Sequence, residues 1–425
     1  MVRHDRFLWG SATSAHQVEG NNVLSDWWEW ERRGKIKEPS GLACDHYSRY
    51  KDDFAIIKNL GHTAHRFSIE WSRLEPKEGA SDESAWEHYR DVIGELRSLD
   101  IEPIVTLNHF TLPNWLAEKG GWSRSLSVDL FERFAKKAVE KLGDSVSCWI
   151  TINEPMVYAL SSYLYGRWPP MRASFQDMAP VVINMIRGHA KAYTAMRKAS
   201  AALFPGRKIS IGIAKGLNKF DPFNKRSPFD ALAVFSRHRF FNHLFITSLM
   251  SGWIRFPGFG IKKLSAAKTL DFLGVNYYTR QFVRYSGSGS VKLFGEDCGN
   301  PDPSGSMRRN FLGWEVYPEG LYLLLKDISK YRLPCIITEN GICADDDGDR
   351  SRFIEEHLDA LFRAKAGGVR VFGYLYWSLL DNFEWADGYG PRFGIVDVDY
   401  KTQKRTVRKS AYFLSELMRK KLAET

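Results

Sequence analysis

Two short stretches of the sequence each end an apolar, β-forming run on a glutamate. WITINEP (149–155) carries Glu154 directly before a proline, and CIITENG (335–341) carries Glu339 shortly before a glycine. Neither stretch has a cluster of metal-ligand residues beside it. Two carboxyl groups that face each other across a cleft can hydrolyse a glycosidic bond, one as acid and base, the other as nucleophile or as base for water. This chemistry requires a fold that brings the two glutamates together.

Eight apolar runs are typical of buried parallel strands, and amphipathic stretches with helical spacing lie between them. The runs are residues 7–13, 65–69, 102–107, 147–152, 208–214, 271–278, 335–338 and 371–377. The clearest helical stretches are 50–61, 85–100, 128–145, 180–200 and 352–368. This alternation predicts the α/β class and a single-domain (β/α)8 TIM barrel with extended βα loops, formed by residues 1–425. Residues 285–313, rich in Gly, Ser, Pro and Asn, are predicted to be a long loop.

The carboxyl ends of the predicted strands carry polar and aromatic side chains, and active sites of such barrels form at these ends. The residues at or just after them are Arg66, Glu70, His109, Asn153, Glu154, Asn276, Tyr278, Glu339 and Trp377. Each has a simpler explanation when taken alone, such as a surface glutamate or a hydrogen-bonded core histidine. Their convergence on one barrel end favours a catalytic site.

Composition excludes several other classes of protein. Hydrophobic residues make up 44% of the 425 residues and charged residues 26%, which is typical of a globular protein. The net charge of +10 is spread along the chain, so it does not indicate a nucleic-acid partner. The five cysteines show no CxxC pattern, and no signal peptide or run of 18 apolar residues is present. We therefore expect a cytoplasmic protein with no membrane partner.

Several motifs, in order along nearly the whole chain, resemble those of family 1 glycoside hydrolases, the relatives of β-glucosidases and β-galactosidases. They are FLWGSATSAHQVEG (7–20), RFSIEWSR (66–73), NHFTLPNWL (108–116), TINEP (151–155), DFLGVNYYTR (271–280), ITENG (337–341) and YWSLLDNFEWADGYGPRFGIVDVD (376–399). The resemblance implies a (β/α)8 barrel that cleaves β-glycosides with retention of anomeric configuration and without a cofactor. The expected partner is a small β-glycoside or a short oligosaccharide.

The same resemblance implies a role for each matching residue. Glu154 would be the general acid/base and Glu339 the nucleophile, with their carboxyl groups roughly 5–5.5 Å apart. Arg66, Asn276 and Tyr278 would orient the nucleophile. Binding of the sugar would fall to Gln17, His109, Asn153, Trp377, Glu384 and Trp385.

Glu384 narrows the expected substrate. A carboxylate can accept hydrogen bonds from two neighbouring hydroxyls, such as O4 and O6 of a hexose, and it repels a 6-phosphate. The phospho-β-glycosidases of the family have a serine here, a lysine seven residues on and a tyrosine nine residues on, whereas this chain has Glu384, Pro391 and Phe393. We therefore expect unphosphorylated glucosides, with galactosides and fucosides possible. A thioglucosidase is disfavoured because that branch replaces the acid/base, here Glu154, with glutamine.

Two other functions remain compatible with the sequence. A transglycosidase would use the same catalytic residues and differ only in its preference for a sugar acceptor over water. A non-catalytic sugar-binding module on the same barrel would be expected to lack one of the two glutamates, and both are present. GRWPPMRAS (166–174) departs from the family pattern where loops shape the leaving-group side, so the leaving group stays open.

Overall fold

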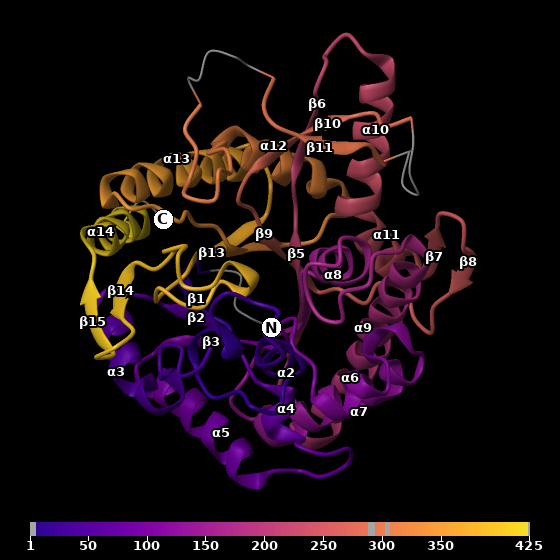
Figure 1. Ribbon diagram of the computed structural model, residues 1–425. Coiled ribbons are helices and arrows are strands. Elements are labelled where there is room, and N and C mark those ends of the chain that lie inside the picture. Colours follow the sequence, from indigo (N-terminus) through magenta and orange to yellow (C-terminus); the bar gives the residue numbers. More distant parts are fainter. Residues whose placement is uncertain (1–5, 288–293, 302–306, 424–425) are drawn as a thin grey trace.

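The fold is a closed barrel of eight parallel strands surrounded by helices (Figure 1). The computed structural model describes residues 6–287, 294–301 and 307–423. The barrel strands are β1 (Leu8–Ala12), β2 (Ala64–Ser68), β3 (Glu102–Asn108), β4 (Cys148–Asn153), β5 (Ser210–Gly216), β9 (Phe272–Asn276), β12 (Cys335–Glu339) and β13 (Val371–Trp377). β1 pairs with both β2 and β13, which closes the barrel. The prediction of a (β/α)8 barrel is confirmed, and each predicted strand overlaps the observed one.

A ring of helices covers the barrel, because each crossover between parallel strands returns over the outer face of the sheet. The covering helices are α3 (His46–Asn59), α5 (Glu83–Ser98), α7 (Leu126–Leu142), α9 (Phe175–Leu203), α11 (Leu244–Ser251), α12 (Pro318–Ile328), α13 (Asp347–Ala366) and α14 (Lys409–Ala423). Further helices lie in the connections: α1 (Ala15–Val18), α2 (Asp26–Arg32), α4 (Trp71–Leu74), α6 (Asn114–Glu118), α8 (Pro155–Ala159) and α10 (Pro228–His238). No helix in the described part of the chain is both long and apolar enough to cross a membrane.

Alternation along the strands builds two apolar layers, because successive side chains of a strand point to opposite faces. On β5, Ala214 belongs to the cluster that fills the barrel interior. Ile211 and Ile213 belong to the larger cluster between strands and helices. The interior is therefore packed with side chains, and a site can form only where the strands end.

Small antiparallel and mixed sheets lie in the connections between barrel strands and helices. They comprise β6 (Lys219–Pro222) with β10 (Arg280–Arg284) and β11 (Glu296–Cys298), β7 (Trp253–Phe256) with β8 (Gly260–Lys263), and β14 (Val396–Asp399) with β15 (Lys404–Val407). The prediction of an unbroken loop over 285–313 is wrong at residues 296–298, which pair with β10. Residues 288–293 and 302–306 of that segment lie outside the described part.

One buried aspartate anchors the loop between β13 and β14, which carries Glu384 and Trp385. Asp381 is fully buried. It accepts hydrogen bonds from Arg408 Nη2 at 2.7 Å and from the backbone N–H of Gly394 at 2.8 Å. The chain on both sides of the loop is thereby tied to one carboxylate.

Substituting this carboxylate should destabilise the fold strongly. We expect Asp381→Ala to lower the free energy of unfolding by about 3–5 kcal/mol, because it breaks the ion pair of a buried carboxylate with Arg408 and leaves the buried N–H of Gly394 without its acceptor. Asp397→Ala is the matched control, since Asp397 also bonds Arg408, at 2.9 Å, but its side chain is 44% exposed. That control should lose no more than about 1 kcal/mol. Guanidinium denaturation measures both losses, and equal losses would contradict the anchoring role of Asp381.

Candidate active site

A local irregularity of β4 aims Glu154 at the barrel mouth. Ile150 pairs with Gly212 of β5, yet Asn153 pairs with Ala214, so β4 contains one residue more than its neighbour there. Such bulges re-aim side chains and are common beside active sites. Glu154 follows with φ 43°, a left-handed conformation that is unusual for a residue with a side chain. Pro155 then begins α8, where its fixed φ suits the first helical position.

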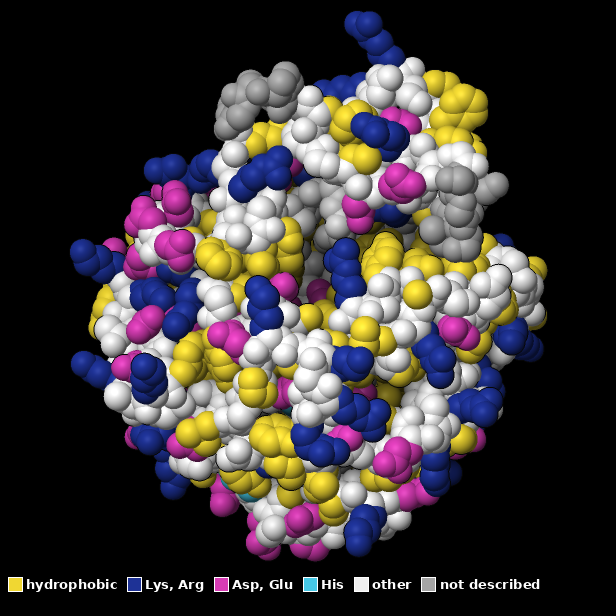
Figure 2. All heavy atoms as spheres, viewed as in Figure 1, with side chains coloured by type: hydrophobic (Ala, Val, Ile, Leu, Met, Phe, Trp, Pro, Cys, Tyr) yellow, Lys and Arg dark blue, Asp and Glu magenta, His cyan; other side chains and the backbone are white. Residues whose placement is uncertain are grey.

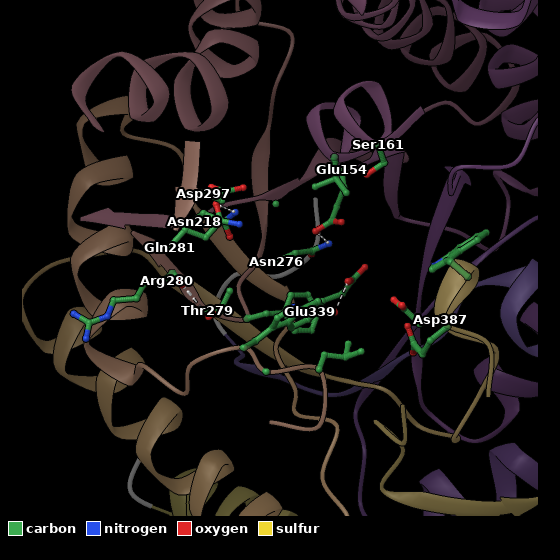
Figure 3. Close-up of a pocket in the computed structure, with 18 of the residues that line it drawn as sticks. Glu154, Ser161, Asn218, Asn276, Thr279, Arg280, Gln281, Asp297, Glu339 and Asp387 are labelled. Carbon is green, nitrogen blue, oxygen red and sulfur yellow. Dashed lines mark hydrogen bonds between the residues drawn. The ribbon is translucent and has the colours of Figure 1, made fainter. Parts of the chain in front are cut away.

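Glu339 reaches the same mouth through a similar irregularity in β12. Ile337 pairs with Val275 of β9, and Glu339 pairs with the next residue, Asn276, so β12 also contains one extra residue before its glutamate. Glu339 is 4% exposed. Figure 3 shows Glu154, Asn276 and Glu339 extending toward one cavity.

Arg66 and Tyr278 hold the Glu339 carboxyl group at both oxygens. Arg66 Nη1 lies 2.5 Å from Oε1, and the Tyr278 hydroxyl donates to Oε2 at 2.7 Å. Burial raises the pKa of Glu339 above its usual range, and these two contacts oppose that rise. They therefore favour the ionised form of Glu339, as a nucleophile requires.

The surroundings of Glu154 favour its protonated form instead. Burial and the neighbouring charge of Glu339 raise its pKa to about 8, and the hydrogen bond from Asn276 only partly opposes this. The amide of Asn276 donates to Glu154 Oε1 at 3.1 Å, and Asn276 also lowers the pKa of Glu339, the residue that it was predicted to orient. The two carboxyl groups titrate as a pair. The proton of the pair is favoured at Glu154, where a general acid needs it.

Polar groups predicted to bind the sugar form a hydrogen-bonded layer around the glutamates. Asn153 accepts from Arg66 Nη2 at 2.7 Å, and its amide donates to Nε2 of His109 at 3.1 Å. Burial and the charge of Arg66 hold the pKa of His109 well below its usual range, so this imidazole is neutral. Gln17 donates both amide protons within the protein, to Asn382 and to the carbonyl of Phe383. Its Oε1 accepts from Ser14, and this oxygen has a second lone pair for a substrate hydroxyl.

Two indole rings and a third carboxyl group complete the predicted sugar-binding set. The rings of Trp377 and Trp385 lie nearly parallel to the His109 ring, with interplanar angles of 19° and 11°. The indole N–H of Trp377 points toward Glu384 Oε1 at 3.4 Å. Burial raises the pKa of Glu384 to about 8. Hydrogen bonds donated by the hydroxyl groups of a bound sugar would stabilise the ionised form of Glu384.

These groups surround a cavity with a volume of about 550 Å³, large enough for a sugar and part of its leaving group. Of the residues predicted to form the site, only Arg66 and Asn153 do not line it; they contact residues that do. The wall near Glu154 also carries Ser161, Asn218, Gln281 and Asp297 (Figure 3). Figure 2 shows this hollowed face of the molecule, over which Lys and Arg alternate with Asp and Glu.

Sequence reasoning missed two residues next to Glu154. Gly216 ends β5, and a Cβ atom there would lie 2.8 Å from Glu154 Oε1, so a larger residue would displace the Glu154 carboxyl group. Lys215 precedes it and is fully buried. The signal was present, because a lysine and a glycine directly follow the apolar run that was predicted to end at residue 214.

One other cluster in the described part of the chain has the composition of a metal site, and it lies outside this cavity. It consists of His238, His243 and Asp327, whose carboxylate lies 3.1 Å and 2.8 Å from the two Nε2 atoms. The amide of Asn242 donates to Nδ1 of His238 and also bonds the carbonyl of Asn218. This fixes the His238 proton on Nε2, facing Asp327. The cluster is therefore a hydrogen-bonded network.

A barrel mouth with paired carboxyl groups beside indole rings is typical of enzymes that cleave glycosidic bonds. Comparison with known proteins identifies the family. The family model described as glycosyl hydrolase family 1 matches residues 3–423, and the chain belongs to this family of glycoside hydrolases. The resemblance of its motifs to that family is thereby confirmed.

The chain resembles characterised relatives over nearly its full length. It is 34% identical over 447 residues to β-glucosidase A of Thermotoga maritima, covering 97% of each chain. It is 31% identical over 484 residues to β-galactosidase of Pyrococcus woesei, covering 96% of this chain and 95% of the relative. The solved structure of a β-glycosidase from Pyrococcus horikoshii superimposes with a TM-score of 0.90 at 40% identity, covering 98% of this chain and 94% of that one.

Loss of the Tyr278 hydroxyl should change the pH profile of the enzyme. The hydroxyl opposes the raised pKa of Glu339, so Tyr278→Phe raises that pKa further and the ionised form of Glu339 appears only at higher pH. We expect the acidic limb of kcat/KM to move to higher pH by about one unit, the effect of one hydrogen bond to a charged group.

The adjacent tyrosine provides the control for this measurement. Tyr277 is also buried, but its hydroxyl donates to the carbonyl of Tyr317. Tyr277→Phe should therefore leave the acidic limb in place. An unchanged limb in Tyr278→Phe, or the same shift in both variants, would contradict the contact between Tyr278 and the nucleophile.

Proposed function

We propose that this chain is a retaining, exo-acting β-glycosidase of the β-glucosidase type that hydrolyses unphosphorylated β-glycosides by double displacement. The single observation that carries the proposal is the unequal surroundings of the two carboxyl groups. Glu339 is bonded to a guanidinium and a phenol hydroxyl. Glu154 accepts a hydrogen bond from an amide, has no ion-pair partner among the described residues, and has a pKa raised to about 8. This division supplies an ionised nucleophile and a protonated acid at the same pH.

The first half of the proposed reaction forms a glycosyl-enzyme. Glu339 attacks the anomeric carbon while Glu154 gives its proton to the departing glycosidic oxygen, whose bond to that carbon breaks. Glu339 is then esterified and carries no charge. Loss of that charge removes the main Coulombic cause of the raised Glu154 pKa, so Glu154 ionises more readily.

The second half returns both carboxyl groups to their starting states. Glu154, now ionised, takes a proton from water, and the resulting hydroxide attacks the anomeric carbon and displaces Glu339. Two inversions give net retention of configuration. All groups that react belong to this chain or to the substrate, so the proposed reaction needs no cofactor. A separation of the carboxyl groups of roughly 5–5.5 Å is part of this proposal.

The proposed substrate is a small glycoside or short oligosaccharide with a terminal glucose. Glu384 would accept hydrogen bonds from O4 and O6, and this tolerance at C4 makes galactosides and fucosides further candidates. The names of the relatives, a β-glucosidase and a β-galactosidase, support this range. Preference for a 6-phosphoglycoside over the plain glycoside would contradict it. We further propose that residues 1–425 act as one catalytic domain in the cytoplasm, with no nucleic-acid or membrane partner.

Azide rescue of two variants tests the assigned roles. With 2,4-dinitrophenyl β-D-glucoside, Glu154→Ala should still form the glycosyl-enzyme, because this leaving group needs no acid. Azide then attacks that intermediate, and the product is the β-glycosyl azide. Glu339→Ala should give the α-glycosyl azide, because azide attacks the substrate directly in place of the missing carboxylate. NMR of the products distinguishes the two anomers.

Glu102→Gln is a suitable control, since Glu102 begins β3 and so lies at the opposite end of the barrel. This variant should hydrolyse the glucoside with retention and give no azide product above that of the wild type. The same azide anomer from both site variants would contradict the assigned roles. A wild-type product dominated by glycosyl transfer to sugar acceptors would favour the transglycosidase alternative.

A further inference from the structure

A lysine occupies a position on β5 where the two preceding outward-facing side chains are apolar. Lys215 follows Ile211 and Ile213 on the outward face of β5, in the layer between strands and helices. It is fully buried. Burial of a charged or polar group costs free energy that an apolar side chain would not. The position therefore gives Lys215 no evident advantage for stability.

The amine has few partners. Nζ donates to the carbonyl of Gly216 at 2.5 Å and lies 4.3 Å from the centre of the Phe241 ring. Among the residues that the structure describes, no carboxylate lies within ion-pair distance of it. An unpaired buried amine next to a catalytic carboxyl group suggests an electrostatic role.

β5 places the residues on either side of Lys215 next to Glu154. The backbone N–H of Glu154 donates to the carbonyl of Ala214 at 2.7 Å, one residue before Lys215. On the other side, a Cβ atom at Gly216 would approach Glu154 Oε1 to 2.8 Å. Both chain neighbours of Lys215 thus touch Glu154. Phe241, which packs on the amine, lines the cavity as well.

Few other charges compete for either group. The charges that act on Glu154 are those of Glu339 on β12, Arg66 on β2 and Lys215 on β5. The elements packed around Lys215 include β4, α8 with its N-cap and the helical turn 239–243. Their titratable groups are Cys148, Glu154, Tyr158, Arg239 and His243. Of these, Glu154 is the one whose charge acts on Lys215.

We propose that Lys215 is a positioning residue whose buried ammonium favours the ionised form of Glu154, most strongly in the glycosyl-enzyme, where Glu339 carries no charge. The inference rests on the proposed function. Burial lowers the pKa of Lys215 to about 7, and the charge of Glu154 raises it again. The amine therefore carries most charge when Glu154 is ionised, which is the state in which Glu154 acts as a base.

Replacement of the amine by an apolar group of similar length tests this role. In Lys215→Met, Glu154 should hold its proton more tightly, so the alkaline limb of kcat/KM moves to higher pH by about one unit. With 2,4-dinitrophenyl β-D-glucoside, where the second half-reaction limits turnover, kcat at neutral pH should fall about tenfold. KM should fall with it, because the glycosyl-enzyme accumulates.

Ile213→Met is the matched control, since it alters the same face of β5 and keeps the amine. It should leave the alkaline limb of kcat/KM in place, and kcat and KM should each keep their wild-type values. If Lys215→Met fails to fold, Lys215→Gln should produce the same two changes. A wild-type profile in both Lys215 variants, or the same shift in Ile213→Met, would overturn the inference.

Thermal melting provides a readout that does not depend on catalysis. The ordinary pKa of lysine is 10.5, so between pH 7 and about 10 the unfolded chain holds a proton that folded Lys215 has lost. The contribution of Lys215 therefore raises the free energy of unfolding of the wild type as pH rises through that window. The Tm advantage of Lys215→Met should be largest at pH 7 and shrink by pH 10, whereas the Tm difference of Ile213→Met should not depend on pH.

The two readouts separate the inference from the proposed function. If the wild type cleaves no β-glycoside, the proposed function fails, and the positioning role of Lys215 fails with it. If the wild type is active but Lys215→Met shows neither the pH shift nor the pH-dependent Tm difference, only the inference fails.

Discussion

The buried ion pair between Arg66 and Glu339 is the interaction on which the rest of the site depends. The Arg66 side chain is fully buried and that of Glu339 is 5% exposed, so the pair has little screening from water. The same guanidinium donates to Thr106 of β3 and to Asn153 of β4. One side chain from β2 therefore joins three other strands at the carboxyl end of the barrel. Such a charge is tolerable in the interior only because its donors are used.

Several features of the site follow from that arrangement. Burial and the charge of Arg66 keep His109 neutral, so this imidazole is available as a hydrogen-bonding group and does not compete for the proton of the carboxyl pair. Because Arg66 bonds Glu339, the remaining proton is favoured at Glu154, which has no direct cationic partner in the part of the chain that the structure describes. Burial alone would raise the pKa of both carboxyl groups. In the proposed mechanism, these strand contacts decide which glutamate is the acid and base and which is the nucleophile.

The sequence was sufficient to predict the barrel and the residues around its mouth, because both depend on local patterns. Apolar runs locate the strands, and the strand ends determine which polar side chains can lie close together. It could not predict pairing between distant segments, so β11 was missed in a stretch whose composition resembles a loop. It also could not reveal the extra residue in β4 and in β12 that aims each glutamate. Lys215 was overlooked because its burial depends on α8 and the Phe241 ring packing over β5.

A covalent trap would test the central claim, that Glu339 forms the glycosyl-enzyme, most directly. Treatment with 2,4-dinitrophenyl 2-deoxy-2-fluoro-β-D-glucoside slows the second half-reaction more than the first, so the intermediate should accumulate. Mass spectrometry of a peptic digest should then find one fluoroglucosyl group on the peptide that carries Glu339, and none in Glu339→Gln. A label on any other residue, or hydrolysis with inversion and no label, would contradict the assignment of Glu339 as the nucleophile.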